Sequence, residues 1–452
     1  MKNRYKILSV FSVVILTIGF SFYLLPWKML LAQRLQILLE DKGFQNVRLT
    51  LSDLNLHSAK IRNISIGDDT PLLLKDLTLL YSPRALWKGN LQELTVSGLS
   101  LEMYKDKTRW RLQGYNASSA EGKFYFPVTA EQLSFLPFDH LALGDSQIRI
   151  VTDPWQIKAP LEFRWHKIPV PEVVVKSENP SFEMGKMKAH IASAEINAAI
   201  NQQKEIWQGF WSLKDVQLKT ENAVIPALDL KGTLEVDART LTLAGRMESK
   251  ESAGYAEFTL GYSLENSEKT VLTLTQAALP WQGGMVMIGK TEIPLTDKKA
   301  VKVLLQVKKV SVDSFLQSLT GKKVSATGVV SGTLPLIIGR DGTVFFEQGI
   351  LKADGPGTIT LPEDLIPGDH EQVVLTREIL KDFQYDTLSL SIRNDTGNKM
   401  SVLAAIEGKN PAVMKGRAVQ LNVRINGDLL DLIRQNVILF TDPQQILDQN
   451  HP

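Results

Sequence analysis

The sequence contains no cysteine among its 452 residues. This absence excludes disulfide bonds, a thiol nucleophile, thiolate metal ligands and lipidation through cysteine. The net charge is also small, at +2, and three of the positive charges (Lys2, Arg4 and Lys6) lie within the first six residues. The remaining residues therefore carry a net charge of −1. That value argues against a nucleic-acid-binding surface, which needs a strong basic patch.

Motifs for catalysis are missing as well. The six histidines are scattered, with no His-x-His and no pair four residues apart, so no zinc site is indicated. There is no G-x-S-x-G, no P-loop and no G-x-G-x-x-G. The stretch Asp354–Thr358 predicts a turn, and the acidic pairs Asp68-Asp69 and Glu363-Asp364 predict solvated loops. We therefore expect a protein that is not an enzyme, with no catalytic residues, no metal and no cofactor.

One uncharged apolar run, residues 7–27 (ILSVFSVVILTIGFSFYLLPW), is long enough to cross a bilayer. About 20 apolar residues span a hydrocarbon core of roughly 30 Å. The basic residues before it place the N-terminus in the cytoplasm. A cleaved signal peptide is the alternative, but the run is longer than a typical h-region and no A-x-A-like site follows. We predict cytoplasmic residues 1–6, a transmembrane anchor at 7–27 and a bulk that lies outside the cytoplasm.

Helical patterns are few. Residues 28–44 have leucines spaced to share one helical face, and Gly43 suits a C-cap. This helix is expected to close one end of the extracytoplasmic domain or, alternatively, to lie along the membrane surface. Shorter helical segments are predicted at 84–87, 312–319 and 429–434.

Alternation of apolar and polar residues dominates the chain from Val47 onward. Runs such as VRLTLSDLNLHS, AEFTLGYSL and TLSLSIRND place one face of each strand in apolar surroundings and the other in water. Gly, Asn and Asp separate the runs at roughly 8–15 residue intervals, as in an antiparallel meander. The sequence predicts a mainly β fold, an elongated and twisted antiparallel sheet with few short helices.

A weak repeat supports an extended sheet. LQELTVSGLSLEM from Leu91 and FDHLALGDSQIRI from Phe138 share apolar residues at equivalent positions, and LSDLNLHSAKI from Leu51 shares most of them. Repeats of this kind stack and do not close into a globule. The apolar face of such a sheet needs cover, from helices, from a second sheet or from lipid acyl chains held in a curled sheet.

The C-terminal half resembles a known family. Four ordered segments are similar to the C-terminal domain of the YdbH-like proteins: WQGGMVMIGKTEIPL (Trp281–Leu295), SGTLPLII (Ser331–Ile338), EQGILKADGPGTITL (Glu347–Leu361) and VQLNVRINGDLLDLIRQN (Val419–Asn436). The likeness covers residues 272–436. Residues 80–104 and 141–150 resemble the wider AsmA-like group to which that family belongs.

The resemblance implies a protein anchored in the inner membrane of a Gram-negative envelope, whose periplasmic β-groove conducts phospholipids towards the outer membrane. It also implies a small outer-membrane lipoprotein that extends the sheet at its C-terminal end. We divide the chain accordingly into an AsmA-like N-terminal helix with β repeats (28–122), a middle β-groove segment (123–271) and a YdbH-like C-terminal β domain (272–452). Expected partners are phospholipids and the inner membrane, without nucleic acid.

Candidate lining residues of the groove are apolar residues of the alternating runs. They are Leu94, Val96, Leu141, Leu143, Ile148, Ile150, Leu241, Leu243, Val271, Leu274, Leu388 and Leu390. Leu272 departs from the parity of Val271 and is omitted. The candidate edge strand for a protein partner consists of Val419, Leu421, Val423 and Ile425.

Two alternatives remain open at this point. The same residues would pack an ordinary β-sandwich core if protein covers the apolar face. An envelope scaffold would instead hold partners at its sheet edges and carry no lipid. A charge placed in the groove is neutral for a scaffold but abolishes lipid conduction.

Overall fold

The computed structural model describes residues 27–41, 44–67, 71–88, 90–106, 109–112, 138–152, 155–167, 170–185, 187–219, 224–237, 239–263, 270–294, 300–320, 325–339, 344–360, 368, 370–394 and 400–427. The chain divides into two compact units, which we describe separately: unit 1 (residues 1–183 and 190–209) and unit 2 (184–189 and 210–452). The predicted anchor lies outside the described residues, apart from Trp27. In the part of the chain that is described, no helix is long and apolar enough to span a bilayer.

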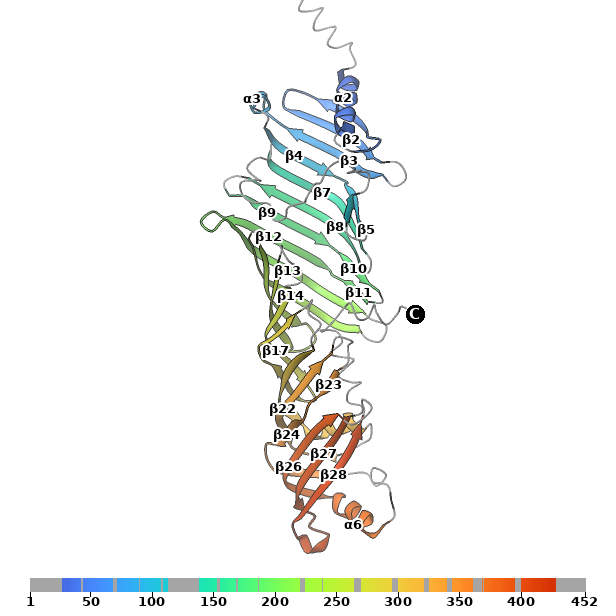
Figure 1. Cartoon of the computed structure of the whole chain (residues 1–452), viewed down its shortest axis with the longest axis vertical. Coiled ribbons are helices and arrows are strands. Elements are labelled where there is room, and N and C mark those ends of the chain that lie inside the picture. Colours follow the sequence, from blue (N-terminus) through green and yellow to red (C-terminus); the bar gives the residue numbers. More distant parts are fainter. Residues whose placement is uncertain are drawn as a thin grey trace, which may run out of the picture. The chain divides into compact units, whose positions relative to one another are not determined.

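The described part of unit 1 is a β-sheet accompanied by the helices α2 and α3 (Figure 1). The helices are α2 (Trp27–Asp41) and α3 (Pro83–Trp87). The strands are β1 (Arg48–Leu54), β2 (Ser58–Ile66), β3 (Leu72–Leu80), β4 (Leu91–Ser97), β5 (Ser100–Asp106), β6 (Arg109–Leu112), β7 (Phe138–Val151), β8 (Trp155–His166), β9 (Glu172–Glu178) and β12 (Ser193–Asn201). β7 runs parallel to β4 and β5, and the pairs β1–β2, β2–β3, β7–β8, β8–β9 and β9–β12 are antiparallel. The strands β10 (Ser181–Met184), β11 (Met187–His190) and β13 (Ile206–Lys219) contain the unit boundaries.

The register of unit 1 gathers apolar side chains on one face. Leu77 pairs with Ile61 and with Val96, and Val96 pairs in turn with Leu143. Directly opposed residues lie on the same face of a sheet. The other face carries cross-strand ion pairs, namely Arg62–Asp76 at 3.3 Å, Glu102–Arg149 at 3.6 Å and Lys176–Glu195 at 3.0 Å. One face is therefore apolar. The other is exposed to water, and we call it the wet face.

Two bulges preserve this sidedness where the sequence breaks its alternation. Asn63 (φ 52°) and Asp145 (φ 48°) adopt the left-handed conformation that Asn and Asp tolerate best. Asn63 lies where β2 has one residue more than β1, and Asp145 lies where β7 has one residue more than β8. With this extra residue, an odd spacing no longer moves a side chain to the opposite face. Leu143 and Ile148 can therefore share the apolar face although they are five residues apart.

Helix α2 covers the first strands of the apolar face. Ala32, Leu35 and Leu39 pack with a cluster from β1, β2 and β3. The N–H of Val47 donates to the Glu40 carboxylate at 3.3 Å and fixes the far end of the helix. The structure confirms the helices that were predicted at 28–44, 84–87 and 312–319, which correspond to α2, α3 and α5 (Val312–Thr320).

Unit 2 continues the same alternation in antiparallel pairs. Its strands are β14 (Val224–Val236), β15 (Thr240–Ser249), β16 (Tyr255–Ser263), β17 (Val271–Trp281), β18 (Gly284–Ile288), β19 (Thr291–Pro294), β20 (Val301–Ser311), β21 (Ser325–Ala326), β22 (Val329–Ile338), β23 (Val344–Phe346), β24 (Gly349–Ala353), β25 (Gly357–Thr360), β26 (Phe383–Asn394), β27 (Met400–Lys409) and β28 (Val419–Gly427). Among its described residues, the helical elements are α5, α6 (Glu371–Leu380) and the 3₁₀ turn η3 (Met414–Gly416). The predicted helix at 429–434 lies outside the described residues.

A closed hydrophobic core fills the C-terminal end of unit 2. The fully buried Phe315 and Val312 of α5 lie in one cluster with inward-facing residues of β20, β22, β24, β26 and β27. Tyr385 is buried at its edge and donates from its hydroxyl to Thr327 O at 2.7 Å. Burial raises the pKa of Tyr385, so the phenol keeps its proton as a donor. A Cβ at Gly328 (φ +97°) would lie 2.2 Å from this hydroxyl, so the close approach requires glycine.

Candidate functional site

Six predicted lining residues lie together on the apolar face of unit 1. Leu94 pairs with Leu141, and Val96 pairs with Leu143. Ile148 and Ile150 occupy the same face further along β7. They pair with Leu101 and Met103 of β5 on one side and with Ala159 and Ile157 of β8 on the other. Val96 is 8% exposed, and the other five are half-buried. These side chains lie beyond the strands that α2 covers.

The structure adds residues of β8 and β9 that sequence analysis missed. Phe163 and Trp165 lie opposite Leu143 and Leu141, and Val175 and Val173 continue their rows on β9. The alternation in WQIKAPLEFRWH is the signal that could have identified the β8 members. Trp165 is 2% exposed, and its indole N–H has no acceptor among the described residues.

In unit 2, three of the predicted residues share one apolar face. Leu243 pairs with Leu234 and Leu260, Leu241 pairs with Val236 and Tyr262, and Leu274 pairs with Phe258. Arg246, on the opposite face, forms ion pairs with Glu257 at 2.9 Å and Glu248 at 2.7 Å. This part of unit 2 therefore has the same sidedness as unit 1.

The choice of Val271 over Leu272 is corrected by the register of β17. Val271 pairs with Gly261 and lies on the polar face with Thr273. Leu272 pairs with Leu260 and shares the apolar face with Leu274. A β-branched residue is well accommodated on either face of a strand, so Val271 gave a false signal.

Leu388 and Leu390 also need correction. Their side chains are 2% and 1% exposed and belong to the core around Phe315. A lipid cannot contact side chains that other protein atoms already cover almost completely. At this end of unit 2, the apolar face is sealed by protein, as in the sandwich-core alternative.

The predicted edge strand corresponds to β28. Val419, Leu421 and Val423 are half-buried and pack against the C-terminal core. The backbone of Ile425 pairs with Val402. Within the described strands, β27 alone pairs with β28, so the second edge of β28 has no described strand beside it.

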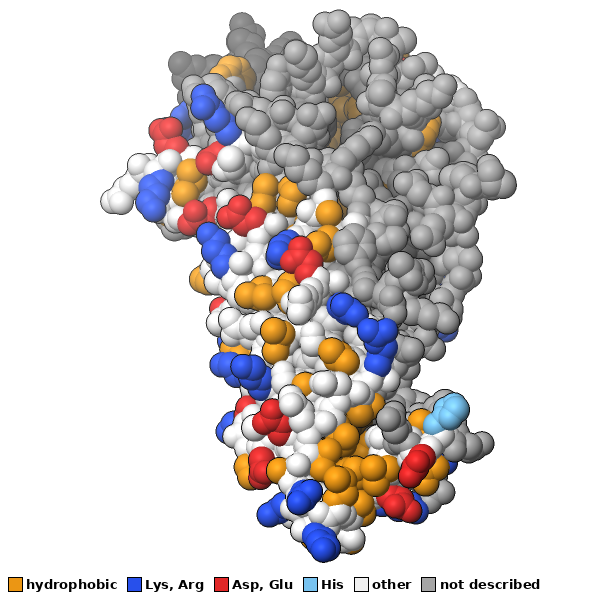
Figure 2. Space-filling model, turned by 60° about the horizontal axis from the view of Figure 1, so that its bottom comes forward, with side chains coloured by type: hydrophobic (Ala, Val, Ile, Leu, Met, Phe, Trp, Pro, Cys, Tyr) orange, Lys and Arg blue, Asp and Glu red, His pale blue; other side chains and the backbone are white. Residues whose placement is uncertain are grey.

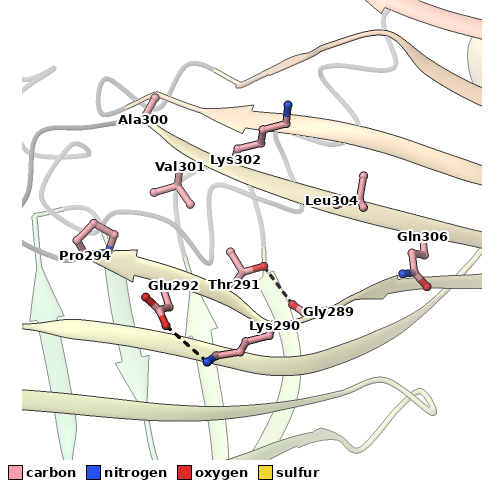
Figure 3. Close-up of a pocket in the computed structure, with 10 residues that line it drawn as sticks. All are labelled: Gly289, Lys290, Thr291, Glu292, Pro294, Ala300, Val301, Lys302, Leu304 and Gln306. Atoms are coloured by element: carbon pink, nitrogen blue, oxygen red, sulfur yellow. Dashed lines mark hydrogen bonds and ion pairs between the residues drawn. The ribbon is translucent and has the colours of Figure 1, made fainter.

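The wet face of unit 2 carries an open cleft of about 650 Å³, lined by residues of the β18–β19 connection, β19 and β20 (Figure 3). Lys302, Leu304 and Gln306 line it and are exposed, whereas Val303 and Leu305 between them are buried. Lysines in the cleft are paired, Lys290 with Glu292 at 3.6 Å and Lys302 with Glu347. The cleft is therefore separate from the apolar face.

Two histidines that are distant in sequence meet on the wet face of unit 1. The Nδ1 atoms of His140 and His166 are 2.7 Å apart across the β7–β8 pair. Their separation of 26 residues gave no sequence signal. In the ranges that the structure describes, no three His, Asp or Glu side chains are grouped to hold a metal ion.

Apolar side chains are also gathered on the surface at the C-terminal end of unit 2 (Figure 2). Val374 and Leu375 of α6 and Met414 of η3 are 41%, 39% and 46% exposed. Asn410 fixes the loop before η3, because its amide donates to Glu378 O and Ile379 O at 3.1 and 3.0 Å.

Comparison with known protein families gives a match over part of the chain. Residues 252–451 match the family model described as "YdbH-like: Intermembrane phospholipid transport protein YdbH". The match contains the whole of the segment, 272–436, in which the resemblance was identified from the sequence. Comparisons with curated proteins and with solved structures gave no match. The matched family and the large, mainly β fold both fit a role in lipid transport.

Proposed function

Because residues 252–451 match the YdbH-like family of intermembrane phospholipid transport proteins, we propose that this chain conducts phospholipids along the apolar face of its sheets. Acyl chains would lie against Val96 and Leu143, which pair with each other in unit 1, and against Leu243 and Leu260, which pair with each other in unit 2. Nothing in this role requires catalysis.

One observation carries the proposal: the sheet is apolar on one face and bears ion pairs on the other. Removing an acyl CH₂ from water is worth about 0.8 kcal/mol, so a lipid whose tails contact this face keeps much of its hydrophobic stabilisation outside a bilayer. Its headgroup remains in water at the rim. Rows of Leu, Val and Ile offer sites of similar free energy, which favours movement along the face.

The anchor belongs to the same proposal. Residues 7–27 would cross the inner membrane with the N-terminus in the cytoplasm, and both units would lie in the periplasm. The sealed core around Phe315 limits the conducting face to strands before it.

Photo-crosslinking in cells tests the proposal directly. A photoreactive residue at Val96 or Leu143 is expected to yield phospholipid adducts by mass spectrometry, because both lie on the apolar face. The same probe at Thr95 or Ala142, one residue away on the wet face, is expected to yield none. Adducts at neither pair in a folded protein would contradict a lipid-filled groove.

We also propose that the edge of β28 that has no described strand beside it binds a small outer-membrane lipoprotein by strand addition. Val423→Pro removes a backbone N–H and is expected to lower partner recovery in a pull-down at least tenfold, about 1.4 kcal/mol. Val423→Ala keeps the N–H and serves as the control. Unchanged partner recovery and complementation with the proline variant would refute this part of the proposal.

A further inference from the structure

One end of unit 1 exposes an unusual set of apolar side chains, which we call the apolar rim. It comprises residues from the start of α2, the end of β1, the β1–β2 turn, the end of β3 and α3: Met29, Leu30, Leu31, Leu54, Leu56, Leu80, Leu86 and Trp87. Trp87 is 93% exposed and Leu56 is 74% exposed. Single exposed apolar residues are ordinary, but a cluster of large ones marks an interaction surface.

Hydrogen bonds hold the three segments of the rim together. Tyr81, which precedes α3, donates from its N–H to His57 O at 2.9 Å and from its hydroxyl to Asn55 O at 2.8 Å. Lys28 in the first turn of α2 donates from Nζ to Ser52 O at 3.0 Å. The β1–β2 hairpin is therefore bonded to α2 through Ser52 and to the segment before α3 through its turn, and α2 and α3 lie at the same end of unit 1 (Figure 1).

Local structure also fixes α3 in place. The Ser82 hydroxyl accepts from the N–H of Ala85 at 3.1 Å, and Pro83 occupies the first turn. The N–H of Leu86 donates to Ser82 O at 2.9 Å. Trp87 is thus held outward by an ordered turn.

The place of the rim in the chain identifies its occupant. Met29 follows within a helical turn of the apolar segment that we propose to cross the inner membrane. The charged residues of this surface include Lys28, Arg84 and Lys88 beside the acidic Asp53, and residues 77–92 contain no carboxylate. Tryptophan and basic side chains favour the headgroup region of a bilayer that contains anionic lipids.

We infer that the apolar rim rests on the periplasmic leaflet of the anchoring membrane, with Trp87 and Leu56 inserted among the headgroups; this inference rests on the proposed function. The contact has a consequence for lipid uptake. α3 connects β3 and β4, whose Leu79 and Leu94 pair on the apolar face. When the rim contacts the leaflet, this end of the apolar face lies next to the lipids that the face would take up.

The absence of native cysteine allows a clean test with single-cysteine variants of the full chain. Trp87→Cys, Leu56→Cys, Met29→Cys and Leu73→Cys are each labelled with a nitrobenzoxadiazole fluorophore and reconstituted in vesicles of phosphatidylethanolamine and phosphatidylglycerol. Leu73 is the matched control, because it is 49% exposed at the other end of β3. Lipids with a nitroxide at acyl carbon 5 are expected to quench positions 29, 56 and 87 and to spare position 73.

The outcomes separate the inference from its premise. Quenching at 29 without quenching at 56 and 87 overturns the rim contact and leaves the anchor intact. No quenching at any position overturns both. As a second measurement, the double variant Leu86→Glu/Trp87→Glu should lower the yield of lipid adducts at Leu143 on the order of tenfold. Phe210→Glu, at another exposed aromatic residue, should leave that yield unchanged, and equal yields in both variants overturn the role in uptake.

Discussion

Replacing Leu143 with glutamate is expected to abolish phospholipid conduction while the protein stays folded. Leu143 lies in the middle of the apolar face, between Val96 of β4 and Phe163 of β8, and it is only half-buried. A carboxylate there keeps some contact with water in the empty protein, so the fold survives. An acyl chain in its place would desolvate the charge, at a cost of several kcal/mol. We expect lipid adducts at Val96 to fall by at least about 100-fold, since 1.4 kcal/mol is tenfold.

Ala142→Glu is the matched control for this prediction. Ala142 is adjacent in sequence, equally half-buried, and lies on the wet face between Thr95 and Arg164. A glutamate there meets water and a basic neighbour, and both function and folding should be retained. Growth complementation and lipid mass spectrometry are measured on both variants, with circular dichroism as the check on folding. If both variants complement equally, the envelope scaffold without lipid becomes the better explanation.

The sidedness of the sheet could be predicted because a strand alternates with a period of two. Residues such as Leu94 and Val96 need no tertiary information to be assigned to one face. The bulge at Asp145 is different, because it changes the parity between Leu143 and Ile148 without a reliable sequence signature. The pair formed by His140 and His166 depends on the β7–β8 register, which local patterns do not encode.

Whether protein or lipid covers an apolar face depends on the tertiary structure. The alternation around Leu390 is indistinguishable from that around Leu143, yet one is sealed in a core and the other is half-exposed. The difference is made by α5, which is far away in sequence and brings Phe315 into the same cluster. α6 was missed because its apolar residues do not form one buried stripe: Ile379 and Leu380 are buried, whereas Val374 is exposed.

Leu390→Glu is expected to have the opposite phenotype from Leu143→Glu, namely loss of folding. Leu390 is 1% exposed and pairs with Leu351 of β24 on one side and Ala404 of β27 on the other. Burying a carboxylate there without a partner, and losing the packing of a leucine, should lower the free energy of unfolding by more than about 4 kcal/mol. Urea unfolding and limited proteolysis measure this loss.

Ser391→Glu provides the control, because Ser391 is half-buried on the wet face of the same strand and should tolerate the charge. Together with the Leu143 pair, these variants separate two kinds of apolar face within one chain. A sealed face loses stability when charged, because its packing is the core. A charge on a conducting face abolishes function and leaves folding intact, because that face contacts lipid and is not packed against protein. Normal stability of Leu390→Glu with fewer lipid adducts would instead restore Leu388 and Leu390 to the groove and extend the conducting face to the C-terminal end.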